Sequence, residues 1–182
     1  MKKLFVLMLA LCLLCSAAMA EENAVYELSW ENSLSEQPNL ETNGTTQSIT
    51  IPEVATFLYW IPNDLSAVDV STIQEEIPPV AAFGAAEGEK VYTVSVFALN
   101  IPSLEAYAAA LKDQGADIDN AKTLSINGLQ AVAVECEPEN IDMLLVPVSD
   151  TMILLYTFTP LNGDEDWDQV KAYIVSSIRL GE

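Results

Sequence analysis

The links between four apolar segments in the second half of the chain restrict the fold more than any other sequence feature. The segments span residues 122–126, 129–136, 141–148 and 151–158. Asn127 and Gly128 form a typical two-residue hairpin turn between the first two, and Ser149 and Asp150 turn the third into the fourth. Parallel strands need a connection of about a dozen residues or more, so these links predict an antiparallel meander.

The third and fourth segments are apolar at successive positions instead of alternating with polar residues. In the third segment, Met143 and Leu145 lie on one face of the expected strand, and Leu144 and Val146 lie on the other. A sheet with one wet face shows alternation, so we expect both faces of this sheet to be covered. The pattern predicts an α+β protein, arranged as a three-layer αβα sandwich around a central antiparallel sheet.

Two amphipathic segments are suited to cover the sheet. Ser103 is the expected cap of a helix that ends at Gly115. Asp164 is the expected N-cap of a final helix, because acids follow it in the first turn and favour the positive end of the helix dipole. The apolar stripe of that helix comprises Trp167, Val170, Ile174 and Ile178.

The rest of the chain fits one domain over residues 21–182. Further strands are expected at 25–30, 48–51, 56–61, 80–85 and 90–99. The last two are separated by only four residues and must therefore run antiparallel. Residues 31–46 are polar and rich in turn formers, which predicts a surface connection. In residues 63–79 the apolar residues have no regular spacing, which suggests at most a helical turn.

The N-terminus has the order of residue types that is typical of an export signal. Lys2 and Lys3 precede an apolar run, and Ala18 and Ala20 flank the expected cleavage site. We therefore expect residues 1–20 to be a signal peptide and the protein to be secreted or held in the cell envelope. The apolar run is too short for a comfortable bilayer span, so no membrane span is expected after cleavage.

Lipidation is the alternative to free secretion, because two cysteines lie near the cleavage site. Cys12 and Cys15 each follow a leucine, whereas a lipoprotein signal normally has a small residue there, so this alternative ranks second.

Charge and composition exclude several function classes. The chain has 27 Asp and Glu against 7 Lys and Arg, no His, and a formal charge of −20. Serine triads, Cys/His pairs and His-bearing zinc sites all need histidine. A nucleic-acid backbone would be repelled, whereas a cationic protein partner is favoured. We expect no cofactor and no catalysis.

Acids at the start of the final helix raise the alternative of an extracellular calcium-binding protein. Asp164, Asp166 and Asp168 offer the carboxylate oxygens that calcium prefers, but helix capping explains the same residues. Asp113, Asp117, Asp119 and Asn120 form a second, weaker group. A carboxylate-dependent hydrolase is the third hypothesis, and it needs two acids facing each other across a cleft.

Cysteine and tryptophan provide the remaining candidates. Cys136 is flanked by acids, which disfavours a reactive thiolate, and we expect a small buried strand residue. Trp60 and Trp167 are expected in the core. Trp30 borders the polar connection, and an exposed Trp30 would favour a contact site.

Several short motifs resemble those of small exported proteins from gut-dwelling Gram-positive bacteria, and through them the PsbP-like αβα-sandwich group. The motifs lie at residues 26–31, 58–62, 103–108, 126–129 and 174–178. They cover most of the chain from residue 25 to 180, in order, and are mainly structural. The resemblance implies protein binding without catalysis. Metal sites in that group draw on histidine, which this chain lacks, so the resemblance assigns no site residue.

Overall fold

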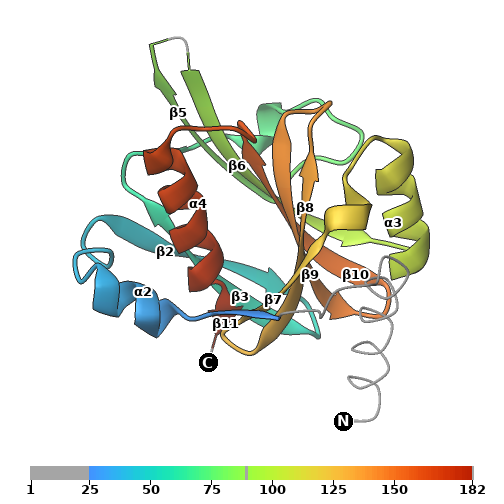
Figure 1. Cartoon of the computed structure of the whole chain (residues 1–182), viewed down its shortest axis with the longest axis horizontal. Coiled ribbons are helices and arrows are strands. Elements are labelled where there is room, and N and C mark those ends of the chain that lie inside the picture. The colour runs from blue at the N-terminus through green and yellow to red at the C-terminus, as the bar shows by residue number, and fades with distance from the viewer. Residues whose placement is uncertain (1–24, 89, 182) are drawn as a thin grey trace.

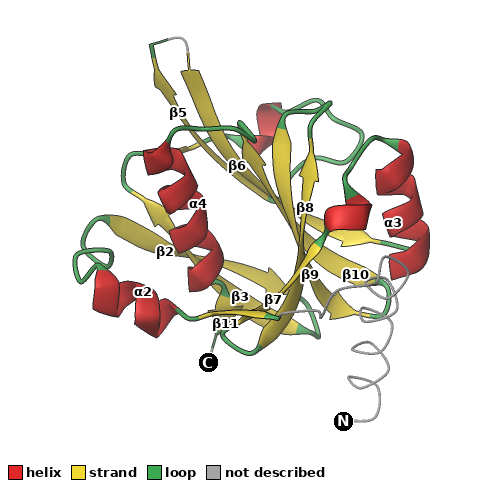
Figure 2. Cartoon of the chain, in the orientation of Figure 1, coloured by secondary structure: helices red, strands yellow, loops and turns green. Residues whose placement is uncertain are grey.

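Figure 1 shows the computed structural model of the chain, which describes residues 25–88 and 90–181. The expected signal peptide, with Cys12 and Cys15, lies outside the described residues. The described part combines one large sheet, one small sheet and three α-helices, so the α+β prediction is confirmed at this level (Figure 2). No helix in this part of the chain has the length and apolar character to cross a bilayer.

The large sheet has eight strands in the order β1-β7-β8-β9-β10-β6-β5-β4. Their bounds are β1 Tyr26–Leu28, β4 Ser66–Ala67, β5 Ala81–Glu87, β6 Lys90–Asn100, β7 Lys122–Ile126, β8 Leu129–Cys136, β9 Ile141–Ser149 and β10 Met152–Thr159. Strands β7 to β10 form the antiparallel meander that the short links predict, and β5 and β6 pair antiparallel as expected.

The central strands of the large sheet are antiparallel as predicted, and one edge of the sheet departs from this. β1 pairs parallel with β7, and Tyr26 lies opposite Leu124. Nearly a hundred residues separate these two strands, so the connection is long enough for a parallel pairing. Nothing local in the sequence of either strand specifies that pairing.

Both faces of β9 and β10 are buried, as their uninterrupted apolar pattern predicts. Leu144 and Tyr156 belong to one core cluster, whereas Met143 and Leu155 belong to a second cluster on the opposite face. The second cluster is closed by α3 (Leu104–Asp113), which contributes its apolar stripe. Both β9 and β10 therefore contribute side chains to two hydrophobic clusters, one on each face of the sheet.

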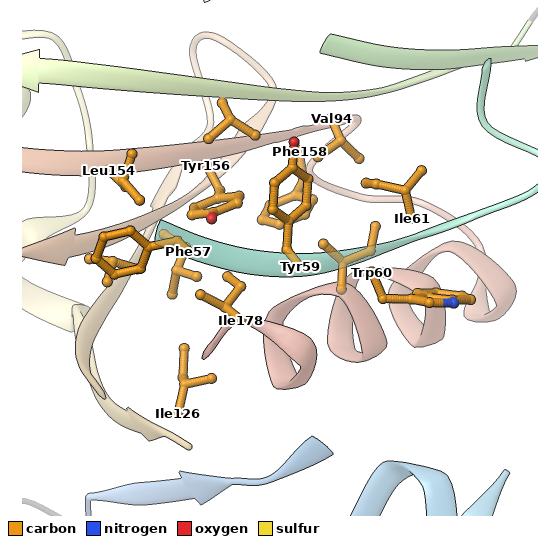
Figure 3. Packing of buried hydrophobic residues seen from close by; sticks show 14 of the residues in the cluster. Phe57, Tyr59, Trp60, Ile61, Val94, Ile126, Leu154, Tyr156, Phe158 and Ile178 are labelled. Carbon is orange, nitrogen blue, oxygen red and sulfur yellow. The ribbon is translucent and has the colours of Figure 1, made fainter. Parts of the chain in front are cut away.

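The first cluster is closed by a second sheet together with a helix. The small sheet has the order β11-β3-β2, with β2 Gly44–Ile51, β3 Ala55–Pro62 and β11 Arg179–Leu180, and α4 spans Glu165–Ser177. Tyr59 points from β3 into the core, and its ring meets that of Tyr156 edge-on at 5.6 Å (Figure 3). Trp60 leaves the strand on the other side, where its ring lies 6.0 Å from Trp30. The sequence pattern does not reveal this separate sheet.

The predicted surface connection over residues 31–46 is only partly correct. A short helix, α2, occupies Trp30–Glu36, and β2 begins at Gly44, four residues before the expected start. The N-cap residue of α2, Ser29, makes no side-chain capping bond. Tertiary contacts stabilise α2 instead. Ser33 Oγ lies 2.8 Å from Ser176 Oγ of α4, and Trp30 is buried. Local sequence signals could not have shown this helix.

The predicted helix starts are confirmed. Ser103 accepts a hydrogen bond from the Ala106 N–H (3.1 Å) at the start of α3, and Asp164 accepts one from the Trp167 N–H (3.0 Å) at the start of α4. Gly115 follows α3 with a φ of 94°, a left-handed conformation that favours glycine. Residues 63–79 contain β4 and a single 3₁₀ turn, η1 (Val70–Thr72).

Candidate functional site

A groove of about 550 Å³ lies between α4 and the strands β7, β8 and β9. Its apolar surface includes Leu28, Leu124, Ala133, Leu144 and Val175. Charged and polar side chains also line it: Asp117, Asn120, Lys122, Glu135, Asp142, Asp168 and Lys171. An apolar floor with a few convergent polar groups is the usual composition of a binding site.

An ion-pair network fixes one side of this groove. Lys171 of α4 donates to Asp142 of β9, to the Asp168 carboxylate (3.0 Å) and to the Leu161 carbonyl (3.0 Å). The side chain of Lys171 is only 13% exposed. Its three donors therefore all have acceptors inside the protein, and the network holds the helix at a fixed position over the sheet.

The electrostatics of the network are dominated by acid. Burial alone would lower the pKa of the Lys171 ammonium, but its hydrogen bonds to Asp142 and Asp168 outweigh burial and hold that pKa above its usual value. Burial raises the pKa of the Asp142 carboxyl, and the charges of Glu135 and Asp168 add to this against the pull of Lys171. Lys171 is thus shared by two carboxylates and Lys122 pairs with Glu135, so the four acids of the groove outnumber its two lysines and its net charge is negative.

A second hollow, of about 470 Å³, adjoins the start of α4. Here Asp164 accepts hydrogen bonds from Lys90 Nζ (2.9 Å) and from the Tyr92 hydroxyl (2.9 Å), in addition to its capping bond. These donors lower the pKa of the Asp164 carboxyl to about 2, with the Lys90 bond as the largest cause. The carboxylate is therefore already occupied by protein donors.

The three acids predicted as weak calcium ligands do not converge. Asp164 faces β6, Asp168 pairs with Lys171, and Asp166 is exposed beside the second hollow. Within residues 25–88 and 90–181, no three His, Cys, Asp or Glu side chains are grouped so that they could hold a metal ion. Capping and ion pairing account for Asp164 and Asp168.

The second acidic group also has structural contacts. Asp117 accepts from the Asn120 N–H (3.3 Å) and side-chain amide (2.8 Å) across the 3₁₀ turn η2 (Ile118–Asn120). Asp119 pairs with Lys112 at 2.6 Å, which ties this turn to the end of α3. Asp113 is exposed and lies on the last turn of α3.

The tryptophans and Cys136 belong to the core. Trp60 and Trp167 are buried as expected, and Cys136 is buried in the second cluster, also as expected. Trp30 is only 8% exposed, so it offers no stacking surface and the contact site considered for it is absent. Its backbone N–H donates to Asn127 Oδ1 at 2.9 Å.

Sequence reasoning missed the groove and its charges. Asp142 and Lys171 lie 29 positions apart, on elements whose packing is not encoded in a local pattern. One signal was available, because Asp142 is an acid within a strand that is otherwise apolar on both faces. A charge in such a strand needs a partner, and Lys171 is one of few cations in the chain.

Fold and groove together define an acidic α+β protein with a groove formed between its last helix and its large sheet. Comparison with protein-family models gives no match, and comparison with curated proteins gives none either.

Proposed function

We propose that this chain is an exported, non-catalytic binding or accessory module whose partner is a cationic protein. The α4 groove carries the proposal, because it combines an apolar floor with a rim on which four acids outnumber two lysines. A lysine or arginine side chain has that combination, with a methylene stem for the floor and a charged end for the rim. The proposed site therefore fits a basic residue of a partner protein.

The distribution of charge across the molecule supports a cationic partner. Each lysine among the described residues lies within 4 Å of a carboxylate: Lys90, Lys112, Lys122 and Lys171. Arg179 donates to the Ser177 carbonyl at 2.8 Å. The large surplus of acids has no such internal partner and attracts positive charge from outside.

Location and fold group belong to the same proposal. The export pattern of residues 1–20 supports a site of action outside the cytoplasm, either secreted or in the cell envelope. Burial of both faces of β9 and β10 supports a three-layer αβα sandwich of the PsbP-like group. The resemblance to that group favours binding over catalysis.

Affinity capture from the envelope fraction of the producing cell tests the groove. The bait proteins are the wild type and two groove variants, Ala172→Trp, which fills the space, and Glu135→Gln/Asp168→Asn, which removes rim charge. Matched controls on the exposed face of α3 are Ala109→Trp and Glu105→Gln/Asp113→Asn.

We expect a basic protein to bind the wild type and both α3 controls, to be lost from both groove variants, and to be released by salt. Retention of the same proteins by all five baits would contradict the proposed site. Circular dichroism of each bait shows whether it is folded.

A further inference from the structure

The two sheets leave one long strand edge open. The outer strands of the large sheet are β1, with three residues, and β4, with two. The small sheet ends in β11, with two residues, on one side and in β2, with eight residues, on the other. Among the described residues, β2 pairs only with β3. It is therefore the longest outer strand within the part of the chain that the structure describes, and a further strand could join it.

Hydrogen bonds of β3 show which groups of β2 face the open side. The Trp60 N–H donates to Ser177 Oγ (2.7 Å), and the Thr56 carbonyl accepts from Gly181 (2.7 Å), so both residues of β3 point their backbone groups away from β2. In an antiparallel pair, directly opposed residues share this orientation. Their partners Thr46 and Thr50 consequently point their own N–H and C=O groups away from β3.

By the same alternation, Gly44 and Ser48 also point their backbone N–H and C=O groups away from β3. The side chains of Thr46, Ser48 and Thr50 are exposed, and no other described strand supplies backbone partners along this edge. The open edge is therefore a row of backbone donors and acceptors that face solvent.

β2 lacks the features that usually protect such an edge. Natural edge strands carry charged residues, proline or a bulge, or are very short. β2 has no charged residue and no proline, and its register with β3 runs from Gly44 to Ile51 without a shift. An unprotected edge of this length suits strand addition, in which main-chain hydrogen bonds provide affinity.

The acidic residues around β2 indicate which kind of strand could bind its open edge. Residues 25–88 contain ten acids and no Lys or Arg, and exposed Glu41 and Glu53 flank the two ends of β2. A second copy added antiparallel about the middle of the strand would bring Glu41 of one copy towards Glu53 of the other, at both ends. Like charges at that spacing repel, whereas a strand with lysine or arginine at its ends is attracted.

We infer that β2 is a docking edge for an extended, basic segment of a partner protein, which joins the small sheet as an additional antiparallel or parallel strand. The α4 groove and this edge are formed by different residues. The inference therefore goes beyond the proposed function and does not depend on what the groove binds.

The test uses a synthetic peptide of alternating threonine and valine with two lysines at each end, and a control peptide with glutamates in their place. Ser48→Pro removes an outward N–H without removing a bond to β3, whereas Ser48→Ala keeps that N–H. We expect the basic peptide to bind the wild type and Ser48→Ala equally and Ser48→Pro about tenfold more weakly or worse. Ala172→Trp, in the groove, should bind the peptide like the wild type.

Amide hydrogen exchange of the wild-type protein provides a readout that does not depend on any variant folding. The N–H groups of Thr46, Ser48 and Thr50 should exchange quickly in the free protein and slowly with the basic peptide bound. Those of Gln47 and Ile49, which face β3, should be protected in both states.

Four results would overturn the inference. In the binding experiment they are equal affinity of the basic peptide for Ser48→Pro and Ser48→Ala, or equal affinity of the wild type for the acidic and basic peptides. In the other experiments they are peptide-induced amide protection elsewhere than on β2, or a dimer in sedimentation that Ser48→Pro dissociates. The last result would assign the edge to a second copy. Loss of partner capture by the groove variants, with peptide binding intact, would separate the two sites.

Discussion

The side chain of Asn127 joins three parts of the molecule that lie far apart in the chain. Its Oδ1 accepts from the Trp30 N–H at 2.9 Å, and its Nδ2 donates to the carbonyls of Ser176 (2.7 Å) and Ile178 (2.9 Å). The start of α2, the β7–β8 hairpin and the end of α4 therefore share one amide group. Its φ of 48° is left-handed, a conformation that asparagine tolerates.

We predict that Asn127→Gly lowers the free energy of unfolding by about 2 kcal/mol, because glycine keeps the left-handed backbone but loses three hydrogen bonds. Urea unfolding measures the change. Glu53→Gly is the matched control, since Glu53 has a φ of 63° in an exposed turn. That control should leave stability unchanged or raise it by about 0.5 kcal/mol. Equal losses in both variants would show that the Asn127 side chain adds nothing.

At the scale of elements, α4 is held at both ends and along its length. Asp164 caps its first turn, Lys171 binds β9, and Ser177 Oγ accepts from the Trp60 N–H of β3. The helix is thus tied to both sheets by polar contacts as well as by its apolar stripe. This attachment fixes the wall of the groove.

The charge of Asp164 should make folding sensitive to acid. Its folded pKa of about 2 lies below the ordinary value of 3.8, so the unfolded chain binds this proton more readily. The stability that Asp164 contributes is therefore complete above about pH 4 and is lost as the pH falls towards 2. Asp164→Asn keeps a capping oxygen but removes the charge.

We predict that the free energy of unfolding falls less between pH 4 and pH 2 for Asp164→Asn than for the wild type, as measured by urea titration at each pH. Asp166→Asn is the control, because Asp166 makes no hydrogen bond or ion pair with another described residue. Its pH profile should follow the wild type. If the free energy of unfolding fell equally with pH for all three proteins, Asp164 would not be a source of acid sensitivity.

For the whole molecule, the acid surplus opposes compaction. With 27 Asp and Glu against 7 Lys and Arg, folding brings like charges together, and dissolved salt screens their repulsion. The effect is independent of which cation is present, unless a specific site exists. Sodium and calcium can therefore be compared directly.

We predict that the thermal midpoint rises with sodium chloride and that calcium chloride at the same ionic strength gives the same midpoint. The reason is that Asp164 and Asp168 are already paired with Lys90 and Lys171, and no three acids within the described residues are grouped to hold a metal ion. Differential scanning calorimetry measures both series. A further rise with calcium alone would support the alternative of a calcium-binding protein, because a ligand of the folded state stabilises it by mass action.

The sequence by itself determined the features that depend on neighbouring residues. The Asn127-Gly128 turn set the β7–β8 hairpin, Ser103 and Asp164 set two helix starts, and the apolar runs showed that β9 and β10 are buried on both faces. Each rests on a hydrogen bond or a periodicity within a few positions, so the local sequence contains all the information needed.

Only the tertiary structure decided which distant segments meet. The parallel pairing of β1 with β7, the separate small sheet, the burial of Trp30 and the Lys171–Asp142 pair all join residues that no local pattern connects. Their energies come from packing and desolvation, which depend on the whole arrangement of the core. The groove and the open edge of β2 follow from that arrangement, because both are surfaces that packing left uncovered.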